Sequence, residues 1–217
     1  KLKVSVSIFG RSTLVEMEKL RRNQVSRQIK VDDKHVRALS LAADQFVCRS
    51  GKDEQTVIAG YHWFDDRGRD AFISMPGLLL ARGEFKSCRE IFAKFVKHIN
   101  AGVIPGSFSA ETGLPEYNSA DASLWFIVAI YHYLRYTQDF DFVREHLWRA
   151  IQEIIGYYRE GTYFNIKMDG DGLISADAEN SAGKNSPNRY ILPFVSAYDN
   201  PFMCVVIFCI SVSYSSF

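Results

Sequence analysis

Apolar residues recur at steps of three and four along several segments of the chain, the spacing that places them on one face of an α-helix. Residues 84–100 show this most regularly, and the charged side chains of the segment, Lys94 among them, lie off the apolar stripe. The stripe consists of Phe85, Cys88, Ile91, Phe92, Phe95, Val96 and Ile99. A helix with one buried face is therefore predicted here.

Two earlier segments also read as helices. From Asp32 a stripe of Val36, Leu39, Ala43, Phe46 and Val47 predicts a helix that ends at the turn of residues 49–55. Residues 71–83 are apolar almost all round, which is typical of a buried helix. Pro76 within them predicts a kink or a late helix start, because proline cannot donate the usual backbone hydrogen bond.

The later part of the chain continues this pattern. Residues 119–137 are helical in spacing, and Ser119 is a residue type that caps helix N-termini. Residues 139–160 form a further amphipathic helix that Gly161 closes. Residues 163–174 read as a short hairpin, because their Asp-Gly pairs are typical of turns.

These patterns divide the chain into three regions. Residues 1–30 contain a basic segment, predicted to be a solvated helix, a connector or a remnant of a preceding region. Residues 31–180 carry the helical patterns and are expected to form an all-α domain of successive helix hairpins. Residues 181–217 are a divergent tail with about ten apolar residues in succession, short of the ~20 needed to cross a bilayer. We expect a buried strand or a truncated end there, not a membrane anchor.

Composition narrows the function classes. The 217 residues are 47% apolar, 14% aromatic and 24% charged, which is typical of a globular protein. A net charge of +1 gives no support for a nucleic-acid partner or an anionic membrane surface. The four cysteines have neither metal-ligand spacing nor a dense disulfide framework, which predicts no metal site and favours a reducing, cytoplasmic compartment.

One short stretch combines charge and aromatic surface to an unusual degree. "GYHWFDDRGRD", residues 60–70, holds three aromatic residues, three Asp and two Arg. Two later junctions are similar in kind: "PEYNSADASLW" at residues 115–125 and "KMDGDGLISADAEN" at residues 167–180. Pyranose sugars have apolar faces and hydroxyl rims, so their sites combine aromatic rings with carboxylates, amides and Arg. The sequence therefore favours a sugar site.

These motifs also resemble a known family. The stretch from "AGYHWFDDRGRD" to "VIP", followed by "YNSADASLWFIVAIYHYL", closely resembles the C-terminal amylo-α-1,6-glucosidase domain of glycogen debranching enzymes. "AADQFV" and "DGDGLI" extend the resemblance to about residues 40–176. The family fold is an (α/α)6 barrel of about twelve helices, so the resemblance implies that this chain forms part of one. It also implies inverting hydrolysis of the α-1,6-linked glucose left on a trimmed glycogen branch, without a metal or organic cofactor.

The resemblance implies substrate-binding roles for eight residues. Arg69 and Asp70 would bind hydroxyls of the terminal glucose, and Trp63 and Phe64 would shape the pocket wall. The same cavity would be lined from the next helices by Tyr117, Asn118, Asp121 and Trp125. None of these roles is a proton transfer.

The chain departs from the family pattern in three places. Family members usually have Trp at the position of Arg67 and Pro at the position of His62. After "DGLI" the family continues into a Thr-Trp-Met-Asp element with the proposed general acid, whereas this chain continues "SADAENSAGKNSPNRY". Inverting hydrolysis needs two carboxyls about 6.5–9.5 Å apart. The catalytic residues are therefore left unassigned, with Asp177 and Glu179 open as substitutes.

Simpler interpretations stay open for the same residues. Arg69 and Asp70 could form a local ion pair at a helix start, Asp121 could cap a helix, and Trp125 could belong to the core. Three functions compete: an active α-1,6-glucosidase, a glucan-binding relative without catalysis, and a helical interaction protein. An open part-barrel would expose apolar helix faces, so we also expect association through them.

Overall fold

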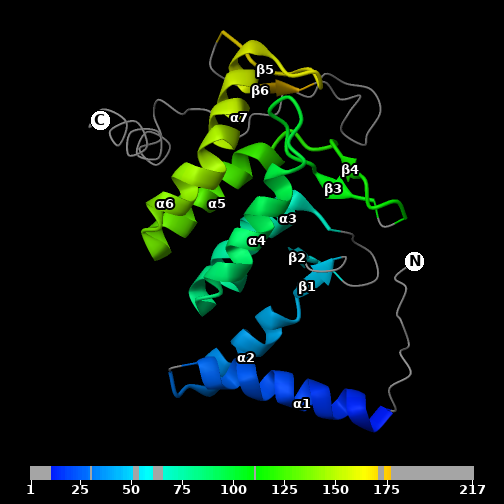
Figure 1. Ribbon diagram of the computed structural model, residues 1–217, viewed down its shortest axis with the longest axis vertical. Coiled ribbons are helices and arrows are strands. Elements are labelled where there is room, and N and C mark those ends of the chain that lie inside the picture. Colours follow the sequence, from blue (N-terminus) through cyan, green and yellow to red (C-terminus); the bar gives the residue numbers. More distant parts are fainter. Residues whose placement is uncertain are drawn as a thin grey trace.

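The structure is a computed structural model, and helices make up most of the chain that it describes (Figure 1). The all-α class predicted from the sequence is therefore confirmed. The structure describes residues 11–29, 31–50, 54–60, 66–109, 111–170 and 174–176. The helices are α1 (Arg11–Gln28), α2 (Lys34–Asp44), α3 (Gly68–Leu78), α4 (Phe85–Val96), α5 (Ala122–Thr137), α6 (Phe140–Phe142) and α7 (Trp148–Glu160), with a 3₁₀ turn at Leu80–Arg82 and a π-helical turn at Val143–Leu147.

Short antiparallel hairpins connect α2 to α3 and α4 to α5, and a third follows α7. In the described residues they are β1 (Val47–Ser50) with β2 (Glu54–Val57), β3 (Ser107–Phe108) with β4 (Pro115–Glu116), and β5 (Ile166–Met168) with β6 (Ile174–Ala176). The third pair is the hairpin predicted over residues 163–174, with Ile166 opposite Ala176. Each hairpin is too small to be a sheet layer, so the fold is built by helix packing.

Helices α3, α4, α5 and α7 alternate in direction (Figure 1). The start of α3 lies beside the end of α4, because a Cβ on Gly68 would be 2.8 Å from Cε1 of Phe95. The starts of α3 and α5 lie together, because Arg69 Nε is 3.2 Å from Oδ2 of Asp121. The end of α7 reaches the same place, where the Tyr158 hydroxyl donates to the carbonyl just before Asp121 at 2.6 Å. We call this end, at which α3 and α5 begin, the loop end.

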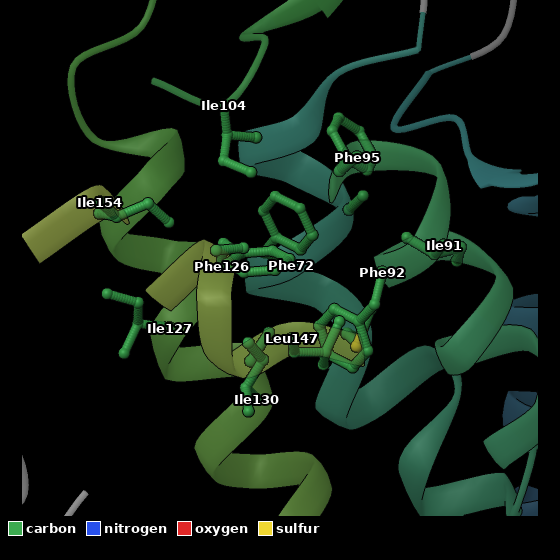
Figure 2. Close-up of a cluster of buried hydrophobic side chains, with 14 of the residues drawn as sticks. Phe72, Ile91, Phe92, Phe95, Ile104, Phe126, Ile127, Ile130, Leu147 and Ile154 are labelled. Atoms are coloured by element: carbon green, nitrogen blue, oxygen red, sulfur yellow. The ribbon is translucent and has the colours of Figure 1, made fainter. Parts of the chain in front are cut away.

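The core lies between these four helices and is rich in aromatic rings (Figure 2). The Phe72 ring has its centroid 4.8 Å from that of Phe95 and 5.3 Å from that of Phe126, both edge-to-face. Phe92 packs edge-to-face against Phe126 at 5.6 Å and Tyr133 at 5.8 Å. Each of these side chains is at most 1% exposed. Edge-to-face pairs contribute about 0.5–1.5 kcal/mol beyond their buried area, so the cluster fixes the helix spacing.

Helix α4 confirms the predicted buried face and corrects one residue. Cys88, Ile91, Phe92 and Phe95 are all buried in the core. Lys94, predicted to lie off the apolar stripe, is instead buried, with a side chain only 4% exposed. The reason is that its ammonium group forms an ion pair inside the protein, described below.

The helix predicted from Asp32 is shorter than its apolar spacing indicates. α2 ends at Asp44, it has no buried residue, and Leu39 is 70% exposed. Val47 belongs to β1, so residues 49–55 contain the turn of a hairpin and do not end the helix. Phe46 and Val47 pack against the core, and their apolar character reflects that contact rather than a helical face.

Two other helix boundaries differ from the prediction. α3 begins at Gly68, earlier than expected, and Pro76 lies in its last turn, so the alternative of a late start is wrong. The helix predicted over residues 139–160 is present but interrupted by the π-helical turn at Val143–Leu147. Gly161 follows α7 as predicted, with a φ of 116° that favours glycine.

Helices α1 and α2 pack together at the opposite end of the molecule from β5 and β6 (Figure 1). A helix is therefore present in the basic segment of residues 1–30, whereas its role as a connector or a remnant of a preceding region stays a prediction. Arg21 of α1 forms an ion pair with Asp44, which also pairs with Arg82 at 3.0 Å. Leu20 of α1 is 64% exposed.

In the described part of the chain, none of the helices is both long and apolar enough to cross a membrane. The predicted tail at residues 181–217 lies outside the described residues.

Candidate functional site

The segment that leads into α3 is fixed by backbone contacts with the loop before α5. The Phe108 amide donates to the Asp66 carbonyl at 3.0 Å, and the Gly68 amide donates to the Gly106 carbonyl at 3.0 Å. Between them Arg67 forms a β-bridge with Ser107. The end of the 60–70 motif is thereby held against β3 at the loop end.

Glycine is required at one of these positions. A Cβ on Gly68 would lie 2.6 Å from the carbonyl oxygen of Pro105, a distance that real Cβ atoms essentially never show. Gly106 is also closely packed, because a Cβ there would overlap the Asn118 side chain and lie 2.8 Å from Cβ of Ser119. The two glycines allow the start of α3 and the residues before α5 to approach each other closely.

Arg69 and Asp121 form the central polar pair of the site. Arg69 Nε lies 3.2 Å from Asp121 Oδ2, and the side chains are 57% and 14% exposed. Asp121 also accepts a 2.6 Å hydrogen bond from the Ser119 hydroxyl. A half-buried carboxylate thus holds an exposed guanidinium, whose remaining N–H groups can reach a ligand.

The same contacts correct two interpretations made from the sequence. Ser119 was predicted to be the N-cap of this helix, but α5 begins at Ala122, so that prediction is wrong. Asp121 does occupy the N-cap position, but its side chain makes no capping hydrogen bond. Its carboxylate instead contacts Arg69, which comes from α3, and Ser119, which lies two residues earlier in the same loop.

Asp70 lies on a different side of α3. It borders a hollow of about 340 Å³ whose described lining is otherwise mostly apolar. The lining residues are Phe46, Val57, Ala59, Asp70, Ile73, Ser74 and Leu78. Neither Arg69 nor Asp121 borders this hollow. Asp70 is half-buried, so its carboxylate stands beside apolar surface, a combination that suits the C–H face and a hydroxyl of one sugar.

Tyr117 and Asn118 lie at the same loop end as Arg69. The Tyr117 hydroxyl donates to the His98 carbonyl at 2.8 Å, and its ring stacks on Phe164 at 5.2 Å. Burial raises the pKa of Tyr117, so the hydroxyl stays protonated. The amide of Asn118, which is exposed, donates to the Ser107 hydroxyl at 3.2 Å. Its side-chain oxygen lies close to Gly106, where it would meet an added Cβ.

The other predicted binding residues are placed less directly. Trp125 is partly buried and packs against the hydrophobic core, as the simpler interpretation of it expected. Trp63 and Phe64 lie outside the described residues, as do the acids Asp177 and Glu179. Their roles stay predictions. Among the residues that the structure describes, no His, Cys, Asp and Glu side chains gather in a group that could hold a metal ion.

A buried ion pair under the motif was missed by the sequence analysis. The Lys94 ammonium contacts Oδ2 of Asp66, and the Thr56 hydroxyl donates to Oδ1 of the same carboxylate. A signal was present, since Lys94 follows Ile91 by three residues and therefore shares its face of α4. A lysine on an otherwise apolar face indicates a buried partner.

Comparison with known proteins agrees with the motifs. A family model described as amylo-alpha-1,6-glucosidase matches residues 41–184 of the chain. The glycogen debranching enzyme of Saccharomyces cerevisiae is 31% identical over 127 residues, which cover 53% of this chain and 8% of that protein. This chain therefore corresponds to a small part of its relative. The resemblance inferred from the motifs is confirmed.

Proposed function

We propose, from the premise that this chain belongs to the amylo-alpha-1,6-glucosidase family, that its loop end binds the α-1,6-linked glucose of a trimmed glycogen or α-glucan branch. The observation that carries the proposal is the Arg69–Asp121 pair at 3.2 Å, where the starts of α3 and α5 meet. An exposed guanidinium held by a carboxylate can donate two hydrogen bonds to adjacent sugar hydroxyls.

The neighbouring side chains support a sugar ligand. Asn118 offers an exposed amide three residues before Asp121, and Asp70 offers a carboxylate beside the apolar hollow on another side of α3. We propose that Trp63 and Phe64 add the aromatic wall, as the motif predicts. Recognition would then combine polar groups at the hydroxyl rim with rings at the apolar face. Neither a metal nor an organic cofactor is part of the proposal.

The reaction proposed for this site is hydrolysis of the glycosidic bond with inversion. One carboxylic acid would protonate the leaving glycosidic oxygen, and one carboxylate would remove a proton from the attacking water. We assign neither role to a residue of this chain. Arg69, Asp70, Asn118 and Asp121 act in the proposal by binding glucose and orienting it.

We further propose that the helices form part of an (α/α)6 barrel. Consecutive helices that alternate in direction are what such a barrel requires, and α3, α4, α5 and α7 satisfy this condition. In a barrel of this kind the loops at one end would surround the ligand. Arg69, Asn118 and Asp121 all lie at that end.

Calorimetric titration with a glucosyl-branched cyclodextrin tests the binding proposal. We expect the parent chain to bind, and Arg69→Ala to weaken binding by about tenfold or more, since hydrogen bonds from a charged donor contribute about 1.5–3 kcal/mol. Arg149→Ala is the matched control. Arg149 is also an exposed arginine, but it lies near the start of α7, whereas the end of α7 is at the loop end. An unbranched cyclodextrin separates recognition of the branch from general glucan binding.

The outcomes distinguish the competing functions. Release of free glucose from the branched ligand would identify an active glucosidase, whereas binding without release would identify a glucan-binding protein. No binding by the parent, together with an Arg69→Ala variant that behaves like Arg149→Ala, would refute the sugar site. That result would favour a helical interaction protein.

A further inference from the structure

The carboxylate of Asp66 lies inside the protein although it belongs to a motif rich in charge. Its side chain is 9% exposed, and that of its partner Lys94 is 4% exposed. Removing two charges from water is unfavourable unless the pair is close and its remaining polar atoms are satisfied. A carboxylate in this position cannot reach a sugar at the surface, so Asp66 needs a different explanation from Arg69 and Asp70.

Contacts from three elements converge on Asp66. Lys94 of α4 contacts one carboxylate oxygen, and Thr56 of β2, which is 1% exposed, donates to the other. The backbone carbonyl of Asp66 accepts from the Phe108 amide of β3 at 3.0 Å. The Lys94 ammonium also lies 4.6 Å from the centroid of the Phe108 ring, within range of a cation–π interaction.

This arrangement controls how the chain enters α3. Only two residues separate Asp66 from Arg69, and both are also held, Arg67 by a bridge to Ser107 and Gly68 by the hydrogen bond of its amide. The direction in which Arg69 leaves the helix therefore depends on the placement of Asp66. Arg69 reaches Asp121 from this fixed backbone.

We infer that Asp66, held by Lys94 and Thr56, is a positioning residue that sets the orientation of Arg69 in the proposed sugar site. The inference rests on the proposed function. It assigns the buried Asp of the motif to preorganisation of the binding arginine rather than to contact with sugar or to chemistry. Ligand-binding side chains held in place by buried contacts lose less freedom on binding, which strengthens affinity.

Hydrogen exchange followed by mass spectrometry tests the local part of this inference without any sugar. In Lys94→Met and Thr56→Val we expect peptides covering residues 66–70 to exchange about tenfold faster or more, while peptides from α7 keep the parent rate. Thr56→Val introduces no unpaired lysine, so it remains informative if Lys94→Met fails to fold. Uniform acceleration over all peptides, or none, would overturn the inference.

Sugar affinity tests the functional part. We expect the Kd for the glucosyl-branched cyclodextrin to rise about tenfold in Thr56→Val, measured with the fully folded chain. Ile130→Val is the control, because Ile130 is fully buried in the core on α5 and its trimming lowers stability away from the motif. If Ile130→Val loses as much sugar affinity as Thr56→Val, the contact between Thr56 and Asp66 has only a structural role and does not position Arg69.

The two hypotheses fail in different ways. If the parent binds and Thr56→Val binds equally well, the positioning role is wrong and the sugar site stands. If the parent does not bind, the proposed function is wrong, and the link from Asp66 to sugar affinity is rejected with it. Local exchange in residues 66–70 still decides whether Asp66 fixes the start of α3.

Discussion

Substitution of Gly68 by alanine offers a quantitative test of the way in which α3 meets the loop before α5. The added Cβ would lie 2.6 Å from the Pro105 carbonyl oxygen and 2.8 Å from Cε1 of Phe95. Ordinary contacts of a Cβ begin at 3.4 Å, so the backbone and the ring would each have to shift. Phe95 is fully buried in the aromatic core and Pro105 belongs to the held loop, so neither can move freely.

The expected loss of stability follows from these contacts. Overpacking of a tight interior site typically costs about 1–3 kcal/mol. A shift of the start of α3 also weakens the 3.0 Å hydrogen bond from the Gly68 amide to Gly106, worth about 0.5–1.5 kcal/mol. Alanine gains up to about 1 kcal/mol over glycine in a helix, which offsets part of the loss. We therefore expect Gly68→Ala to lower the free energy of unfolding by about 1–3 kcal/mol.

Gly77→Ala is the matched control in the same helix. A Cβ on Gly77 meets no atom within 4 Å, so only the helix preference of alanine acts. We expect this variant to be more stable than the parent by about 0.5–1 kcal/mol. Urea unfolding, followed by circular dichroism, measures both changes. A Gly68→Ala protein as stable as Gly77→Ala would refute the close approach of α3 and the Pro105 loop.

Three further predictions concern single side chains. Burial raises the pKa of the Cys88 thiol to about 12, so we expect it to resist iodoacetamide in mildly alkaline buffer and to react in denaturing urea; peptide mapping that finds it alkylated in the native protein would contradict its burial. The hydrogen bond from Tyr133 is the main cause of a lowered pKa for Asp139. Such a carboxylate stabilises the fold above its ordinary pKa, and the contribution disappears as the pH falls through the folded pKa. Asp139→Asn should therefore lower the melting temperature at neutral pH and converge with the parent in acid, and a constant difference would exclude this explanation. Tyr117→Phe removes the hydroxyl that donates to the His98 carbonyl but keeps the ring stack, so we expect a loss of about 0.5–1.5 kcal/mol in urea unfolding, and an unchanged midpoint would show that water replaces this bond.

Helix α4 was predictable because its burial is one-sided. The stripe on α4 needed only a spacing rule, and the structure buries Cys88, Ile91, Phe92 and Phe95 as that rule requires. The same rule failed at Lys94, because periodicity assumes that a lysine faces water and cannot identify a buried carboxylate elsewhere in the chain. It also extended α2 too far, since Phe46 and Val47 are apolar for reasons of tertiary packing.

The sequence brought out polar residues at the loop–helix junctions but not the partners that they contact, and their role in binding a ligand stays a prediction. Arg69, Asn118 and Asp121 stood out at loop–helix junctions, and the structure brings them to one end of the helices. The pairing of Arg69 with Asp121 depends on the parallel packing of α3 and α5, which no local pattern encodes. The burial of Asp66 likewise depends on Lys94 of α4 and Thr56 of β2, two elements that lie on opposite sides of Asp66 in the sequence.

The alternation of helix directions places the proposed sugar site and a second set of ion pairs at opposite ends of the helices. The end opposite the loop end carries its own ion pairs, Arg82 with Asp44 at 3.0 Å and Arg89 with Asp139 at 2.5 Å. Arg69 is the second residue of α3, so at 1.5 Å per residue the end of this helix at Leu78 lies about 13 Å away along the axis. Substitutions this far apart are generally additive. Substitutions at the end opposite the loop end can therefore raise the melting temperature of a variant while the residues of the proposed sugar site stay unchanged.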